Sequence, residues 1–312
     1  MPAPTPPPLA PYTSGAGKPS TSGQTYTKLA RTPSDLLLHL EHRGLVIADP
    51  SAALRALEQL GYYRLLIYCR GLQSGGGRWF NPGASFEQVL ELYEFDRQLR
   101  LLCFDAIERI EVALRAAISS TVAVTLGPHF YQDSWHFVSA AWFDHAKLLQ
   151  KIDAAHSLGI EHYRHRYTAP PRPPVWVILE AITFGTLSRL FSGLIPTHRD
   201  LVAKQFSLPT PVLVSWFRAL NGLRNVCAHH GRLWATHLLV DQPIAARAYA
   251  SDFPSVTSPY ARLVVASVLL ADVDPKASNW RRQVVGLFHR FPTVSPHHLG
   301  CPAGWDARPV WS

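Results

Sequence analysis

Residues 216–234, WFRALNGLRNVCAHHGRLW, decide the fold of this chain because they carry the period of one amphipathic helix. Successive side chains turn by about 100° around a helix axis. Apolar side chains then occupy one side: Trp216, Leu220, Leu223, Val226, Cys227, Leu233 and Trp234. Polar side chains gather within an arc of roughly 140° on the other side: Arg218, Asn221, Arg224, Asn225, His229 and Arg232. The stretch predicts a single helix that packs its apolar side on a core.

The polar side of this helix lacks acidic residues. Exposed helices usually combine acidic and basic residues in pairs four apart, but residues 216–234 contain neither Asp nor Glu. The charge that balances the arginines must therefore come from elsewhere. Phosphate is one candidate, and a carboxylate on another helix is the other. The spacing of the residues leaves both interpretations open.

Arg224, Asn225 and His229 are the candidate catalytic residues of the stretch. Asn225 and His229 lie four residues apart on one face, so the amide could orient the imidazole. Arg224 precedes His229 by five residues, which places the two side chains about 140° apart around the axis. One copy spreads them, whereas two copies related by a two-fold axis could bring two sets into one cleft. His230 points to the apolar side and is predicted to be a buried, hydrogen-bonded histidine.

A second strong pattern predicts one very long helix from Ser85 to about Leu126, with apolar residues at helical spacing. Three acid-first pairs four residues apart lie in it: Asp96 with Arg100, Asp105 with Arg109, and Glu111 with Arg115. These pairs favour a scaffold helix stabilised by ion pairs. The alternative is that Glu108 or Glu111 faces Arg224 or His229 and orients it as a supporting acid.

The remaining pattern is also helical, with little sign of strands. Further helices are expected at about 33–43, 50–60, 140–157, 176–191, 260–271 and 279–291. Residues 1–24 are rich in Pro, Ser and Thr and read as a disordered tail, so that 25–312 forms a single domain. The Pro- and Trp-rich end is expected to lie back on the bundle as irregular structure.

Two clusters of aromatic residues have alternative interpretations. Tyr62, Tyr63 and Tyr68 either stack on nucleobases or form a wedge in the core. Residues 161–167, EHYRHRY, alternate tyrosines with basic groups, which suits single-stranded RNA, but they also fit a solvated helix end.

Composition restricts the class of protein. The 312 residues are 47% hydrophobic and carry a net charge of +8, a moderate basic bias that suits a polyanionic partner. The four cysteines are far apart, and the histidines at 129, 136 and 145 form no zinc motif, so neither a metal nor a cofactor is expected. Without a membrane-spanning or signal segment, a cytoplasmic protein is predicted.

The run from Arg224 to His229 resembles the R-N-x-x-x-H signature of HEPN-superfamily ribonucleases. Several longer blocks resemble the Abi-2 (AbiD/AbiF-like) family of bacterial abortive-infection proteins. These blocks are residues 61–70, 86–115, 173–191, 299–311 and LRNVCAHHGRLW at 223–234. The resemblance implies an all-α, HEPN-like helical bundle with additional N- and C-terminal helices, which acts as a homodimer.

The same resemblance implies metal-independent RNA cleavage in anti-phage defence, by attack of the ribose 2′-OH on the adjacent phosphate. His229 would move a proton, Arg224 would stabilise charge on the phosphate, and Asn225 would position either group. RNA binding is assigned to Arg218, Asn221 and Arg232. A toxic nuclease also implies restraint by an RNA or by a protein, as in a toxin–antitoxin pair. Two other interpretations stay open: a non-catalytic RNA-binding module, and a structural protein whose Arg224 and His229 pair with acids of the same chain.

Overall fold

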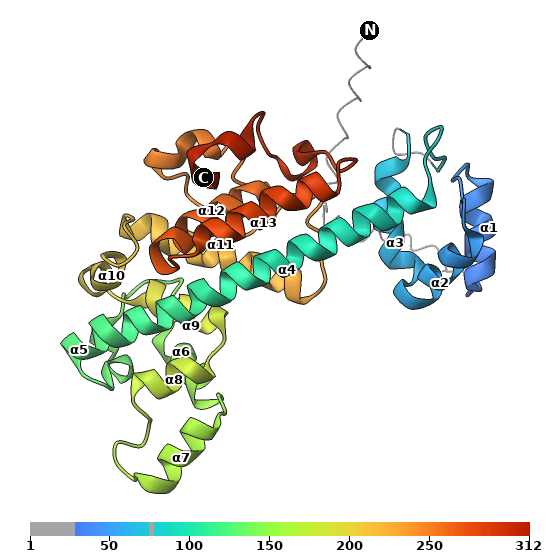
Figure 1. Ribbon diagram of the computed structural model, residues 1–312. Coiled ribbons are helices and arrows are strands. Elements are labelled where there is room, and N and C mark those ends of the chain that lie inside the picture. Colours follow the sequence, from blue (N-terminus) through green and yellow to red (C-terminus); the bar gives the residue numbers. More distant parts are fainter. Residues whose placement is uncertain (1–28, 75–77) are drawn as a thin grey trace.

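The computed structural model describes residues 29–74 and 78–312, and these residues are built of helices (Figure 1). Thirteen α-helices lie in the described residues, where β-structure is limited to isolated bridges. The prediction of an all-α fold is therefore confirmed. The predicted tail, residues 1–24, falls outside the described part of the chain, and the boundaries of the single domain stay a prediction.

The long helix α4 (Phe86–Ala117) is the spine of the molecule. Ser85 caps it in a capping box with Gln88, which satisfies amides at the helix start. Its 32 residues span about 48 Å, and the helix continues through the π-helical segment η2 (Ile118–Val122) into α5 (Ala123–Leu126). The very long helix predicted from 85 to 126 is thus confirmed.

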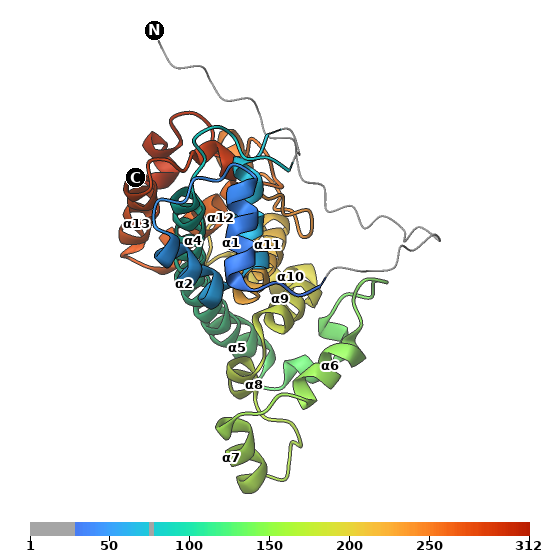
Figure 2. The same cartoon turned by 90° about the vertical axis from the view of Figure 1, so that its right-hand side faces the viewer.

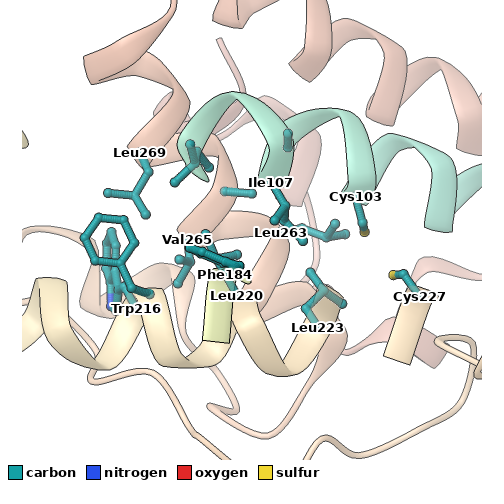
Figure 3. Packing of buried hydrophobic residues seen from close by; sticks show 14 of the residues in the cluster. Cys103, Ile107, Phe184, Trp216, Leu220, Leu223, Cys227, Leu263, Val265 and Leu269 are labelled. Atoms are coloured by element: carbon teal, nitrogen blue, oxygen red, sulfur yellow. The ribbon is translucent and has the colours of Figure 1, made fainter. Parts of the chain in front are cut away.

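Three helices of the C-terminal half pack along α4: α11 (Thr210–Ala228), α12 (Pro259–Val273) and α13 (Ala277–Arg290) (Figure 2). Every residue of α12 from Pro259 to Leu270 is buried, so this helix lies at the centre of the core. In Figure 3, Leu263, Val265 and Leu269 of α12 lie among side chains of α4 and α11. Buried apolar side chains of this size contribute about 1.5–3 kcal/mol each.

The N-terminal helices surround the first turns of α4. They are α1 (Pro33–His42), α2 (Pro50–Leu60) and α3 (Tyr62–Cys69) (Figure 1). Thr32 caps α1 in a capping box with Asp35, and Asp49 caps α2, so both predicted helices are confirmed. Gly61 separates α2 from α3 with φ of 81°, a backbone conformation that glycine adopts without strain.

A group of shorter helices lies toward the other end of α4. They are α6 (His145–Asp153), α7 (Leu158–Arg166), α8 (Val175–Ala181), α9 (Phe184–Gly193) and α10 (Pro196–Ala203). The helix predicted at 140–157 is shorter, and the one predicted at 176–191 is two helices. The break occurs because Ile182 is extended and the Thr183 hydroxyl accepts a hydrogen bond from the amide of Thr186 as the cap of α9.

The C-terminal segment lies back on the bundle, as predicted. It consists of 3₁₀ turns that bury Trp305 and Trp311, and Trp311 stacks on Trp280 of α13 at 6.1 Å between ring centroids. None of the helices in the described residues is long and apolar enough to cross a membrane.

Candidate active site

The stretch that defines the candidate site is a helix followed by a fixed turn. Helix α11 ends at Ala228, so the prediction of one helix up to Trp234 is wrong at its C-terminal end. Two hydrogen bonds close a Schellman motif: the amide of Gly231 donates to the carbonyl of Val226 at 2.7 Å, and that of His230 to Cys227 at 3.0 Å. These bonds fix the backbone at the end of the helix. We refer to residues 226–231 as the corner.

His230 occupies the left-handed position of this motif, with φ of 55°. Its side chain is exposed, so the prediction of a buried histidine is wrong. The helical projection failed here because the backbone leaves the helix one residue earlier. The carbonyl of His230 accepts a hydrogen bond from Arg64 Nη1 of α3 at 3.0 Å, which ties the turn to a second helix.

We expect His230→Gly to stabilise the fold by about 0.5–1 kcal/mol, since glycine adopts the left-handed conformation without the strain of a Cβ atom. The free energy of unfolding in urea measures this change. His229→Gly is the matched control, because His229 has φ of −88° and gains nothing from the freedom of glycine. Equal effects at the two positions would contradict this account of the turn.

A buried carboxylate, Asp96 of α4, holds the chain after the turn. Its Oδ1 accepts from the amides of Leu233 at 3.1 Å and Trp234 at 2.7 Å. Its Oδ2 accepts from Tyr68 Oη at 2.8 Å and from Arg100 Nη1 at 2.6 Å. Four donors from three parts of the chain thus meet on one fully buried side chain.

Arg100 links this carboxylate directly to the turn, because its Nη1 also donates to the carbonyl of Gly231 at 3.3 Å. Burial raises the pKa of the Asp96 carboxyl, whereas Arg100 and the two amides act in the opposite direction. The sequence predicted the Asp96–Arg100 pair but not its place in the site. A signal was present: Asp96 follows Leu92 by four residues and precedes Leu99 by three, so it lies on the apolar stripe of α4.

Arg232 supports the same segment with its guanidinium. It donates to the carbonyls of Ile67 and Ala235 at 3.1 and 3.2 Å, and to Thr236 Oγ1 at 3.2 Å. These bonds give Arg232 a structural part in the loop, whereas its predicted contact with RNA stays a prediction.

The three candidate catalytic residues lie together at the end of α11. Asn225 and His229 are exposed and Arg224 is half-buried. The Oδ1 atom of Asn225 accepts a hydrogen bond from Arg224 Nη1 at 3.3 Å. The described residues show no hydrogen bond between the side chains of Asn225 and His229, so the orientation of the imidazole by this amide stays a prediction. Among the described residues, neither Arg224 nor His229 forms an ion pair with a carboxylate.

Two predicted RNA-binding residues of α11, Arg218 and Asn221, lie further from its end. Arg218 forms an exposed ion pair with Asp241 at 3.4 Å, so one arginine does take its counter-charge from elsewhere in the chain. Asn221 lies against α9, where a Cβ atom at Gly185 would be 3.2 Å from its Oδ1. A side chain at 185 would therefore require the Asn221 side chain to shift slightly.

The proposed supporting acids, Glu108 and Glu111, have different surroundings in the described part of the chain. Glu111 pairs with Arg115 at 2.6 Å, and Arg115 Nε donates to the carbonyl of Leu179 at 2.7 Å. Glu108 is exposed. Within the described residues, no hydrogen bond or ion pair joins either glutamate to Arg224 or His229, and all three predicted pairs of α4 form.

Comparison with known proteins assigns the chain to a family. The sequence profile of Abi-like proteins matches residues 55–235, more than half of the chain, and the chain therefore belongs to this family. The match contains α3, α4, α11 and the turn that Asp96 holds. No curated protein and no solved structure matches the chain. Membership indicates a part in abortive infection, and the resemblance to the Abi-2 family is confirmed.

Proposed function

We propose that this protein is a metal-independent endoribonuclease of abortive infection, with its active site at the end of α11. One observation carries the proposal: Arg224 and His229 are accessible on a fixed backbone corner, and within the described residues no carboxylate neutralises them. A guanidinium in that state suits phosphate. The R-N-x-x-x-H spacing of the same residues, which resembles HEPN ribonucleases, supports this chemistry.

The reaction needs one nucleophile, which the RNA itself supplies. The ribose 2′-oxygen bonds to the adjacent phosphorus as the bond to the 5′-oxygen breaks, giving a 2′,3′-cyclic phosphate and a 5′-hydroxyl. A proton leaves the 2′-oxygen and another reaches the 5′-oxygen, and imidazole is suited to such transfers near neutral pH. His229 moves one of these protons, while Arg224, held by Asn225, stabilises the charge that develops on the phosphate.

A complete site requires two copies of the chain. His229 follows Arg224 by five positions, which spreads their side chains about 140° around the helix. A two-fold axis beside the end of α11 would place the arginine of one copy near the histidine of the other. The homodimer that the HEPN resemblance implies supplies such an axis, and a neutralising partner would cover the same corner.

We expect the purified protein to cleave single-stranded RNA in excess EDTA and to leave 2′,3′-cyclic phosphate ends. Because the 2′-oxygen is the nucleophile, 2′-O-methylation at the cleaved nucleotide should abolish cleavage, and DNA of the same sequence should stay intact. Mapping of the 3′ ends by gel and mass spectrometry measures both. Cleavage that EDTA abolishes, or that 2′-O-methyl RNA undergoes equally, would contradict the proposed chemistry.

One observation favours a second function, a non-catalytic RNA-binding module on the same scaffold. Within the described residues, no hydrogen bond orients the imidazole of His229, whereas general acid–base groups are usually oriented by a partner. RNA that stays intact while it co-purifies with the protein would favour this module over the nuclease.

A further inference from the structure

Helix α3 forms one wall of the corner at the end of α11. Arg64 Nη1 donates to the carbonyl of His230 at 3.0 Å, and Arg232 Nη1 donates in return to the carbonyl of Ile67 at 3.1 Å. The two bonds cross between helix and turn in opposite directions. The exposed face of α3 is therefore continuous with the exposed residues His229 and His230.

Arg64 brings a further cation to this wall. Its guanidinium has several N–H donors, of which one is used on the carbonyl of His230. Among the described residues, Arg64 makes no ion pair with a carboxylate. It is half-buried, and its bond to the fixed turn holds it in place. A guanidinium held in this way, with unused donors, is preorganised for an oxygen anion such as phosphate.

Tyr63, the residue before Arg64, provides an aromatic surface on the same helix. Its side chain is 72% exposed, and its ring contacts the half-buried Tyr62 edge-on at 5.7 Å between centroids. Tyr68 is in the core instead, where it donates to Asp96. The two interpretations of this tyrosine cluster therefore apply to different residues. Tyr68 packs in the core, whereas Tyr63 is open to solvent and available for stacking.

We propose that Tyr63 and Arg64 form a nucleotide-binding subsite for single-stranded RNA beside the candidate active site. Arg64 binds a phosphate that neighbours the one at Arg224 and His229, and Tyr63 stacks on the attached base. The proposal rests on the proposed function for the identity of the ligand. It adds a specificity: stacking on an aromatic side chain needs an unpaired base, so the subsite selects single strands over duplexes.

The test uses the full chain and a single-stranded RNA of twelve nucleotides with 2′-O-methyl groups throughout, which the proposed reaction cannot cleave. Fluorescence anisotropy then reports binding alone. We expect Tyr63→Ala to weaken binding about tenfold and Tyr63→Phe to bind within about twofold of wild type, because phenylalanine keeps the stacking surface. Arg64→Ala should weaken binding and reduce the salt dependence by about one phosphate contact. A duplex of the same sequence should bind more weakly than the single strand.

Matched controls remove an exposed ring or an exposed charge elsewhere. Trp79→Ala removes a ring that is 60% exposed, and Arg282→Ala removes an exposed charge of α13. Both should bind as wild type. If Arg64→Ala loses its helical circular dichroism, the two Tyr63 variants decide the result.

Several outcomes would overturn the subsite. One is equal binding by wild type and Tyr63→Ala, and another is a wild-type chain that binds no single-stranded RNA. A third is a Tyr63→Ala change in oligomeric state with RNA binding unchanged, which would assign this face to a second copy. Cleavage of unmodified RNA is measured separately, so a protein that cuts RNA without needing Tyr63 keeps the proposed function and loses the subsite.

Discussion

Replacement of Arg224 or His229 by alanine is expected to reduce RNA cleavage by about 100-fold or more, and to abolish toxicity on overexpression. Arg224 supplies the cation for the phosphate, and His229 supplies the proton transfer. Within residues 29–74 and 78–312, neither side chain is buried or paired with a carboxylate, so each change should alter the free energy of unfolding by less than about 0.5 kcal/mol. Initial rates on a defined oligonucleotide and urea unfolding measure the two effects.

The matched control for this loss is Arg282→Ala, on helix α13. Arg282 is exposed and belongs to none of the candidate sites, so its removal should cost little cleavage. Equal cleavage by wild type and both site variants would remove the nuclease from consideration and leave the RNA-binding module. A mixture of Arg224→Ala and His229→Ala chains tests the composite site, because a mixed dimer retains one intact arginine and one intact histidine on different copies.

The elements that the sequence predicted well are those in which local chemistry and apolar period agree. The Ser85 cap, the apolar stripe and the i,i+4 ion pairs of helix α4 all lie within one continuous segment of sequence. The starts of α1 and α2 are equally local, since Thr32 and Asp49 accept hydrogen bonds from amides three residues on. Such elements need no knowledge of distant contacts.

The errors arise where a contact distant in sequence, or the backbone itself, overrides the period. The apolar pattern continues through Leu233 and Trp234 although the helix has ended, because Asp96 buries their backbone from another helix. The period alone reads these residues as one more helical turn. The period also wrongly predicts that His230 is buried. It gives no sign of the part of Arg64, since the bond between α3 and the turn joins residues 166 apart in sequence.

Asp96→Ala is expected to destabilise the protein by about 3–5 kcal/mol, the largest single effect on its stability. Removal of the carboxylate leaves the guanidinium of Arg100 buried without a counter-charge. It also leaves the amides of Leu233 and Trp234 without their acceptor. An unpaired buried charge and unsatisfied buried donors both oppose folding. Thermal and urea unfolding measure the loss.

Glu94→Ala is the matched control on the same helix, because Glu94 forms an exposed ion pair with Arg97 and not a buried one. An exposed pair contributes about 0–1 kcal/mol, so this change should have little effect on the free energy of unfolding. Tyr68→Phe lies between the two, since it removes one donor and leaves the Asp96–Arg100 pair intact. If Asp96→Ala were as mild as Glu94→Ala, the carboxylate would not be what fixes the turn, and the rigid corner that presents Arg224 and His229 would need another cause.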